Sequence, residues 1–80
     1  SLADQSTAAP DALAARELAD KLLDTLRPED RLVVTLLDLE GRSVAEVRAL
    51  TGWGETAIRV RAFRARRKLR KELFALEKRR

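Results

Sequence analysis

Residues 43–64 read SVAEVRALTGWGETAIRVRAFR, and this stretch decides the fold. Ser43 and Glu46 have the spacing of a capping box, in which the serine hydroxyl accepts from an amide of the first turn and the glutamate side chain accepts from the serine amide. A short helix is therefore expected to begin here and to end at Gly52. The glycines on both sides of Trp53 predict a tight turn before the next helix. This pattern of two helices joined by a tight turn predicts a helix-turn-helix unit.

Two further helices are expected upstream of this unit. The first runs from an N-cap at Asp11 to about Leu26, and the second begins at Pro28, because proline suits the first helical position. Gly41 can adopt the left-handed conformation that ends the second helix. The sequence therefore predicts an all-α fold of four helices, without a winged-helix hairpin and with a long C-terminal recognition helix. The apolar residues at helical spacing, which are expected to form the core, are Leu13, Ala15, Leu18, Ala19, Leu22, Leu23 and Leu26 in the first helix, Leu32, Val33, Leu36, Leu37 and Leu39 in the second, Val44, Val47 and Leu50 in the third, and Ile58, Ala62, Ala65, Leu69, Leu73 and Leu76 in the fourth.

Length and composition limit the chain to one domain and argue against several functions. Eighty residues support a single core, which is expected over residues 11–80 with the helix-turn-helix unit at about 43–72. The small and polar residues 1–10 are expected to be a disordered linker or a chain end. The absence of Cys and His, with no evident carboxylate cluster, argues against a metal site, a cofactor and enzymatic catalysis. No segment has the character of a membrane span, which favours a cytoplasmic protein that binds neither a membrane nor a small-molecule substrate.

Charge is distributed very unevenly along the chain. Residues 57–80 contain 11 basic and 2 acidic side chains, whereas residues 1–56 contain 6 basic and 11 acidic ones. In a small domain, such a division indicates that the C-terminal part meets a polyanion while the rest stays solvated or meets another partner. Nucleic acid is the leading polyanion.

The last helix carries arginine on the face opposite its core stripe. Almost no acids lie within one turn of these arginines, so they are expected to repel one another, and a ligand outside the chain is expected to compensate. Backbone phosphates would do so, with Arg59 placed to donate to a guanine edge and with Val60 and Phe63 placed to contact thymine methyl groups. The alternative is a face that is only solvated. Trp53 is expected to fill the gap between the last two helices, and for Phe74 a fold-back contact, a protein partner and DNA all stay open. The residues of the arginine-rich face are Arg59, Val60, Phe63, Arg64, Arg67, Arg70 and Lys71.

Three stretches together carry a resemblance to a known family: LRPEDR at 26–31, EGRSVAEV at 40–47 and TGWGETAIRVRAFRARRKLR at 51–70. In this order and spacing they resemble region 4 of bacterial RNA polymerase sigma factors, specifically of the extracytoplasmic-function (ECF) group, over about residues 13–73. The resemblance implies a domain that recognises the minus 35 promoter element, docks on the β-flap of the RNA polymerase core and so directs the polymerase to initiate transcription. It also implies a possible anti-sigma factor that competes for the same surfaces.

The resemblance further implies roles for individual residues. The chain departs from the family pattern at Arg48, Gly54 and Ala57, where alanine, serine and a hydroxyl residue are common. Without a serine at position 54, the start of the last helix is expected either to bind phosphate more weakly or to bind it through bare backbone N–H groups alone. The promoter-melting region 2 of the family is missing, so the chain is expected to be one domain of a longer protein. The base-reading positions fall on Arg59, Val60 and Phe63, and the DNA-backbone positions on Val44, Thr56, Ala57, Arg61 and Arg64, to which the basic face adds Arg67, Arg70 and Lys71.

Two alternatives stay open at this point. One is the DNA-binding output domain of a response or quorum-type regulator, which shares a four-helix plan and binds paired half-sites as a dimer. The other is a protein-interaction module for an anti-sigma factor or a polymerase subunit, in which DNA contact is secondary.

Overall fold

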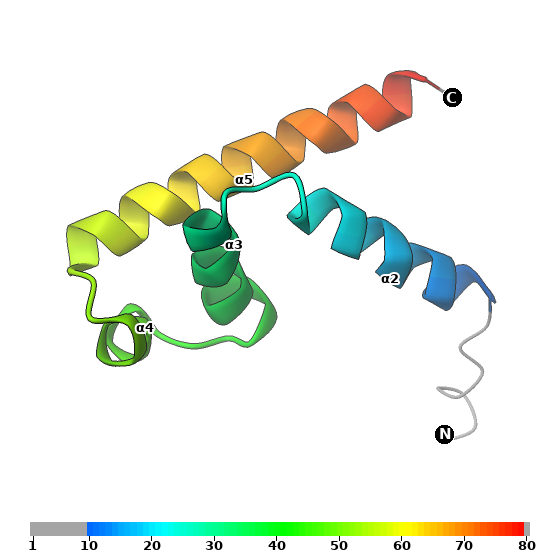
Figure 1. Ribbon diagram of the computed structural model, residues 1–80. Helices are drawn as coiled ribbons and strands as arrows, with labels where there is room; N and C mark the ends of the chain where they lie inside the picture. The colour runs from blue at the N-terminus through cyan, green and yellow to red at the C-terminus, as the bar shows by residue number, and fades with distance from the viewer. Residues whose placement is uncertain (1–9, 80) are drawn as a thin grey trace.

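The computed structural model describes residues 10–79, which form an all-helical domain without strands (Figure 1). The four expected helices are all present, so the predicted fold class is confirmed. The expected linker falls almost entirely on residues 1–9, which lie outside the described residues, whereas Pro10 already belongs to the first helix. In chain order the elements are α2 (Pro10–Leu23), α3 (Pro28–Val34), the π-helical turn η1 (Thr35–Leu39), α4 (Val44–Thr51) and α5 (Glu55–Lys78).

Helix α5 organises the domain, because every other helix packs against it. Figure 1 shows α3 crossing the middle of α5, α4 lying below its first half, and α2 approaching its second half only at the end that leads into α3. The core fills the space between α3, η1, α4 and the first half of α5. Trp53 packs against this core from the turn before α5, as expected from the sequence. The buried core cluster consists of Val33, Leu36, Val47, Ile58 and Ala62.

Most of α2 does not join the core, which corrects the expectation for this helix. Residues 11–21 are all exposed, and only Leu22, Leu23 and Leu26 are partly buried. The helix also ends at Leu23 rather than at Leu26, and Asp11 lies inside its first turn rather than at the N-cap. Helical spacing shows which face of a helix is able to pack, but it does not show whether another element lies opposite that face. Here α2 diverges from α5, so its leucine stripe is left open (Figure 1).

Four leucines elsewhere were also expected in the core and are exposed instead. Leu39 and Leu50 are 65% and 60% exposed, although each lies three residues after a buried residue of the core, Leu36 and Val47. Leu32 and Leu73 are exposed at 42% and 43%. For Leu73 the reason is the same divergence of α2 that uncovers the second half of α5.

The second helix ends in a π-helical turn. The amide of Glu40 donates to the carbonyl of Thr35, five residues back, and the amide of Arg42 donates to Leu36. The first of these bonds is the five-residue bond of the π-helical turn η1, and the second closes the chain after it. Gly41 then turns the chain with a φ of 68°, as its identity predicted. The residues that follow are thereby placed at the start of α4.

Both predicted ends of α4 are confirmed. The Ser43 hydroxyl accepts from the Glu46 amide at 3.0 Å, and the Glu46 carboxylate accepts from the Ser43 amide at 2.8 Å. At the other end, Gly52 has a φ of 81° and donates its amide to Arg48. The left-handed conformation turns the chain sharply enough for α5 to begin three residues later.

Replacing Ser43 with alanine is expected to lower the free energy of unfolding by about 1 kcal/mol, because the Glu46 amide loses its acceptor. Urea unfolding followed by circular dichroism measures this loss. Ser43→Asp, which retains an acceptor at the N-cap, serves as the control and should stay close to the wild type. An equal loss in both variants would contradict the capping role.

No helix within residues 10–79 combines the length and the apolar character needed to cross a lipid bilayer.

Candidate nucleic-acid interface

The first half of α5 presents two apolar side chains to solvent. Val60 is 47% exposed and Phe63 is 59% exposed, on the side of the helix opposite the buried Ile58 and Ala62. Placed within a strongly basic face, this exposed pair offers a ligand apolar contact next to positive charge. These two of the three expected base-reading residues therefore lie where a ligand can reach them.

The start of α4 offers unpaired backbone amides. Ser43 and Glu46 bond each other, and the amide of Val47 donates to the Ser43 carbonyl. This leaves the first amides of the helix, at Val44 and Ala45, without a hydrogen-bond acceptor among the described residues, in the arrangement that favours anions. The phosphate contact expected at Val44 stays a prediction.

The start of α5 is similar but has no side-chain cap. The N-cap residue is Gly54, which has no side chain to accept a hydrogen bond from the first turn. Its carbonyl accepts from the amide of Ile58. The expected phosphate positions Thr56 and Ala57 lie in the first turn, where Thr56 is exposed and Ala57 is partly buried. Any anion here would meet bare N–H groups, as the replacement of serine by glycine predicts.

Two basic hollows flank the exposed face of α5. The first, here called the α4-side hollow, has a volume of about 650 Å³ and brings the start of α4 next to Arg59, Phe63 and Arg70. Its lining residues are Leu37, Asp38, Arg42, Ser43, Val44, Arg59, Ala62, Phe63, Arg66 and Arg70.

The second hollow lies on the other flank of α5, against the connection between α2 and α3, and is here called the loop-side hollow. It measures about 520 Å³, and Phe63 lines it as well. Phe63 therefore lies on the crest between the two hollows. The residues that line the loop-side hollow are Thr25, Leu26, Arg27, Asp30, Phe63, Arg64, Arg67, Lys68 and Lys71.

Three arginines of α5 have acidic partners within the domain, which corrects the expectation that only an outside ligand compensates them. Arg64 donates to both carboxylate oxygens of Asp30, at 3.2 and 2.9 Å. Arg66 does the same to Asp38, at 2.9 and 2.6 Å. Arg59 pairs with Glu55 one turn earlier, at 2.8 Å. The acids that hold Arg64 and Arg66 come from α3 and η1.

The Arg64–Asp30 pair between α3 and α5 is more deeply buried than the Arg66–Asp38 pair between η1 and α5. Asp30 is only 5% exposed, so the Arg64 guanidinium satisfies a carboxylate that water does not reach. The raised pKa of Arg64 has the hydrogen bonds to Asp30 as its main cause. Asp38 is more open, and the hydrogen bonds from Arg66 hold the pKa of its carboxyl below the ordinary value. That pair therefore contributes stability above the unfolded pKa of about 3.8, and the contribution is lost as the pH falls through the lower folded pKa.

Arg61, expected near the DNA backbone, is instead engaged at the turn before α5. Its guanidinium lies 4.5 Å from the centre of the Trp53 ring, a cation–π distance. Its Nε is buried and has no hydrogen-bond partner among the described atoms. The structure therefore places Arg61 on a different flank from Val60 and Phe63, and its phosphate contact stays a prediction.

The remaining expected contacts, Arg67, Arg70 and Lys71, are exposed and pair with no acid within residues 10–79. Sequence reasoning missed Arg27 and Arg42, which line the hollows from outside α5. Helical periodicity relates residues only within one helix, so it carries no signal for them. Lys68 was also missed, although its place one residue after Arg67 put it beside the basic face.

Comparison with known proteins identifies the domain. The family model described as "Sigma-70, region 4" matches residues 16–69, about two-thirds of the chain. The chain belongs to the sigma-70 region 4 family. The match spans the last part of α2, the helix-turn-helix unit and most of α5, and so includes all three expected base-reading positions. No curated protein and no solved structure matched.

Region 4 domains recognise promoter DNA in sigma factors, interact with RNA polymerase and are not enzymes. In this region 4 domain, the described residues hold no group of three or more acidic side chains arranged to bind a metal ion. The two basic hollows with Phe63 between them lie on the part of its surface where the cations of α5 gather.

Proposed function

We propose that this region 4 domain recognises the minus 35 promoter element as the C-terminal domain of an ECF sigma factor, and so directs RNA polymerase to start transcription in the cytoplasm. The observation that carries the proposal is the exposed Phe63 on α5, which lies between two basic hollows and on the same exposed side of the helix as Val60. A helix with this profile fits the major groove, which admits one helix and has a phosphate strand on either side.

In this proposal, Val60 and Phe63 contact thymine methyl groups while Arg59 donates to a guanine. Arg59 first has to leave Glu55, but the side chains of Arg59 and Glu55 are 62% and 56% exposed. A surface pair within one helix is worth about 0.3–0.5 kcal/mol, whereas a bidentate arginine–guanine contact is worth about 1–3 kcal/mol of discrimination. The base contact therefore outweighs the pair. Glu55 holds Arg59 in place until DNA binds.

Arg64 is expected to keep its acidic partner when DNA binds, unlike Arg59. If it left Asp30 for a phosphate, it would leave a buried carboxylate without a partner, which is costly. We therefore propose that Arg64 fixes α5 on α3 and turns only its exposed edge to the DNA backbone. The phosphate contacts then fall mainly on Arg67, Arg70 and Lys71 and on the amides at Val44, Thr56 and Ala57.

Docking on the polymerase β-flap and binding of an anti-sigma factor also belong to the proposal. The exposed leucines of α2, Leu13 and Leu18, and the exposed Leu73 and Phe74 of α5 supply apolar surface for protein partners. The family match counts against the alternative of a dimeric regulator output domain.

The base-reading residues are tested on a duplex selected by this chain from a random library. Arg59→Ala is expected to weaken binding to the selected duplex by roughly 5- to 150-fold. Phe63→Ala, which loses the contact with thymine methyl groups, is expected to weaken binding to the same duplex as well. Both variants should weaken binding to a scrambled duplex much less. Fluorescence anisotropy on both duplexes measures the ratio.

Arg67→Ala is the matched control, because Arg67 is exposed on the same helix without an acidic partner in the described chain. It should weaken binding to both duplexes alike. If Phe63→Ala and Arg59→Ala behave as Arg67→Ala does, base reading by these residues is contradicted.

A further inference from the structure

The cations without acidic partners are not shared equally between the two hollows. In the α4-side hollow, Arg42 pairs with Glu40, Arg59 with Glu55 and Arg66 with Asp38, which leaves Arg70 alone. In the loop-side hollow, Arg27, Arg67 and Lys71 have no acidic partner among residues 10–79. Lys68 in the same hollow has only an exposed contact with Glu72, at 3.6 Å. The positive charge available to a ligand is thus concentrated on the loop side.

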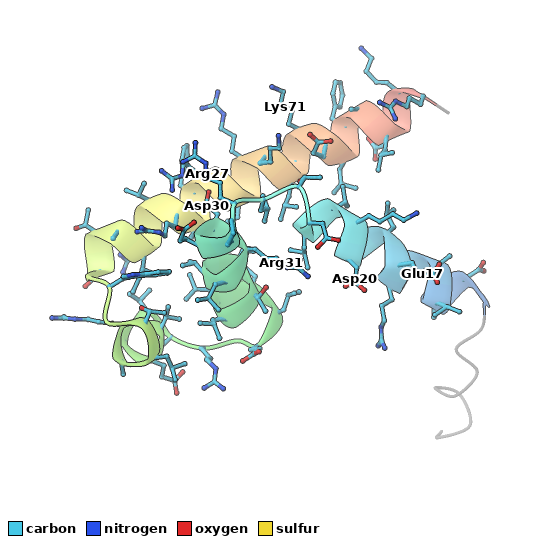
Figure 2. All side chains as sticks on the ribbon, viewed as in Figure 1. Glu17, Asp20, Arg27, Asp30, Arg31 and Lys71 are labelled. Carbon is cyan, nitrogen blue, oxygen red and sulfur yellow. The ribbon has the colours of Figure 1, made fainter. Side chains whose placement is uncertain are left out.

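The position of Arg27 adds a second observation. Arg27 is the N-cap residue of α3 with extended backbone (φ −65°, ψ 148°), and its side chain makes no cap hydrogen bond. The ion pair between Asp24 and Arg31 spans this connection. Figure 2 shows Arg27 beside Asp30 at the start of α3, against the middle of α5, with Lys71 further along α5. The connection thus brings a guanidinium without an acidic partner in the described chain to the flank of α5.

We propose that the loop-side hollow binds the phosphates of one DNA strand, with Arg27 and Lys68 as backbone contacts, while the α4-side hollow binds the other strand. The proposal rests on the proposed function, since it takes α5 to lie in the major groove. It adds the connection between α2 and α3 to the interface, and it assigns each flank of the helix to one strand.

Duplex DNA fits the loop-side hollow better than an acidic protein does. Phe63 lines this hollow and also lies on the exposed side of α5 with Val60. One duplex can therefore contact the hollow and the exposed side of α5 at the same time. Its lining carries five cations and one carboxylate, and that carboxylate, Asp30, is already satisfied by Arg64. A phosphate strand supplies regularly spaced charges without the folding cost of an acidic peptide.

The experiment combines a salt series with duplexes that carry single neutral methylphosphonates on one strand or the other. Arg27→Ala is expected to lower the salt slope by about 0.9, which corresponds to roughly 3.5-fold less loss of affinity between about 50 and 200 mM salt. It should also abolish the effect of a methylphosphonate at the one phosphate that Arg27 contacts, on one strand only. Arg70→Ala, on the opposite flank, should abolish the effect of a methylphosphonate at one phosphate of the other strand. Arg16→Ala, on the exposed part of α2 outside both hollows, is the control and should change neither.

The outcomes separate this inference from the proposed function. If the wild-type chain binds no duplex at low salt, both are overturned. If the wild type binds and Phe63→Ala removes its preference, but Arg27→Ala leaves the salt slope and the strand pattern unchanged, only this inference is overturned. A loss in Arg27→Ala that affects methylphosphonates on both strands equally also overturns it. Circular dichroism of each variant shows that the fold is retained, as expected for a side chain without a cap bond.

Discussion

Replacement of Ile58 by alanine is expected to lower the free energy of unfolding by about 2–5 kcal/mol. Ile58 is fully buried and lies where α5 meets α3 and α4, among Val33 and Val47, which are also fully buried. Removing most of its side chain forfeits the burial of that surface and leaves a cavity that α-helical backbone closes poorly. No other part of the chain can compensate, because the core is so small.

The expected loss at Ile58 is large compared with the free energy of unfolding of the whole domain. A domain of about 70 residues is stable by roughly 4–10 kcal/mol, so this single change removes a large part of it. Urea unfolding followed by circular dichroism measures the loss, and DNA binding at 37 °C should fall with the folded fraction. Leu50→Ala is the matched control, because that side chain is 60% exposed and should cost no more than about 0.5 kcal/mol. Equal losses at both sites would contradict the assignment of the core.

The second large effect is expected at Asp30. Asp30→Ala should lower the free energy of unfolding by about 1.5–3 kcal/mol, because it removes two charge-assisted hydrogen bonds between α3 and α5. Arg64 is then released toward solvent, where it can bind phosphate, so the DNA affinity of the folded protein should not fall in parallel. Arg64→Ala should lower both stability and affinity, since it leaves the Asp30 carboxylate buried without a partner.

Thermal unfolding together with binding to nonspecific duplex DNA measures both quantities for each variant. Asp38→Ala is the control, because its pair with Arg66 is exposed and its loss should be smaller. If Asp30→Ala and Asp38→Ala cost the same, the special role of the buried pair is contradicted.

Local signals in the sequence predicted the helix-turn-helix unit well. The capping box at Ser43, the left-handed glycines at 41 and 52 and the absence of glycine and proline after residue 54 act over a few residues, so they can be read without knowledge of the packing. The exposed Val60 and Phe63 were predicted for the same reason, because periodicity within one helix defines its two faces.

Interactions between helices could not be predicted in this way. Arg64 and Asp30 are 34 residues apart, and Arg66 and Asp38 are 28 apart. Their pairing depends on the crossing of α3 and α5, for which a single sequence carries no signal. The open leucine stripe of α2 has the same cause, since only the path of the chain decides whether a neighbour covers it.

The continuity of α5 has a mechanical consequence. The helix rests on α3 near Ala62 and Ala65, which are buried, and then extends to Lys78 with little cover from α2. At 1.5 Å per residue, its far end lies roughly 20 Å from Ala65 and Val60 lies roughly 8 Å away on the other side. Ile58, two residues before Val60, is fully buried in the core with Val33 and Val47, so the half of α5 that carries Val60 is held in place. A displacement of the last turns therefore bends the helix beyond Ala65 and leaves Val60 and Phe63 where they are.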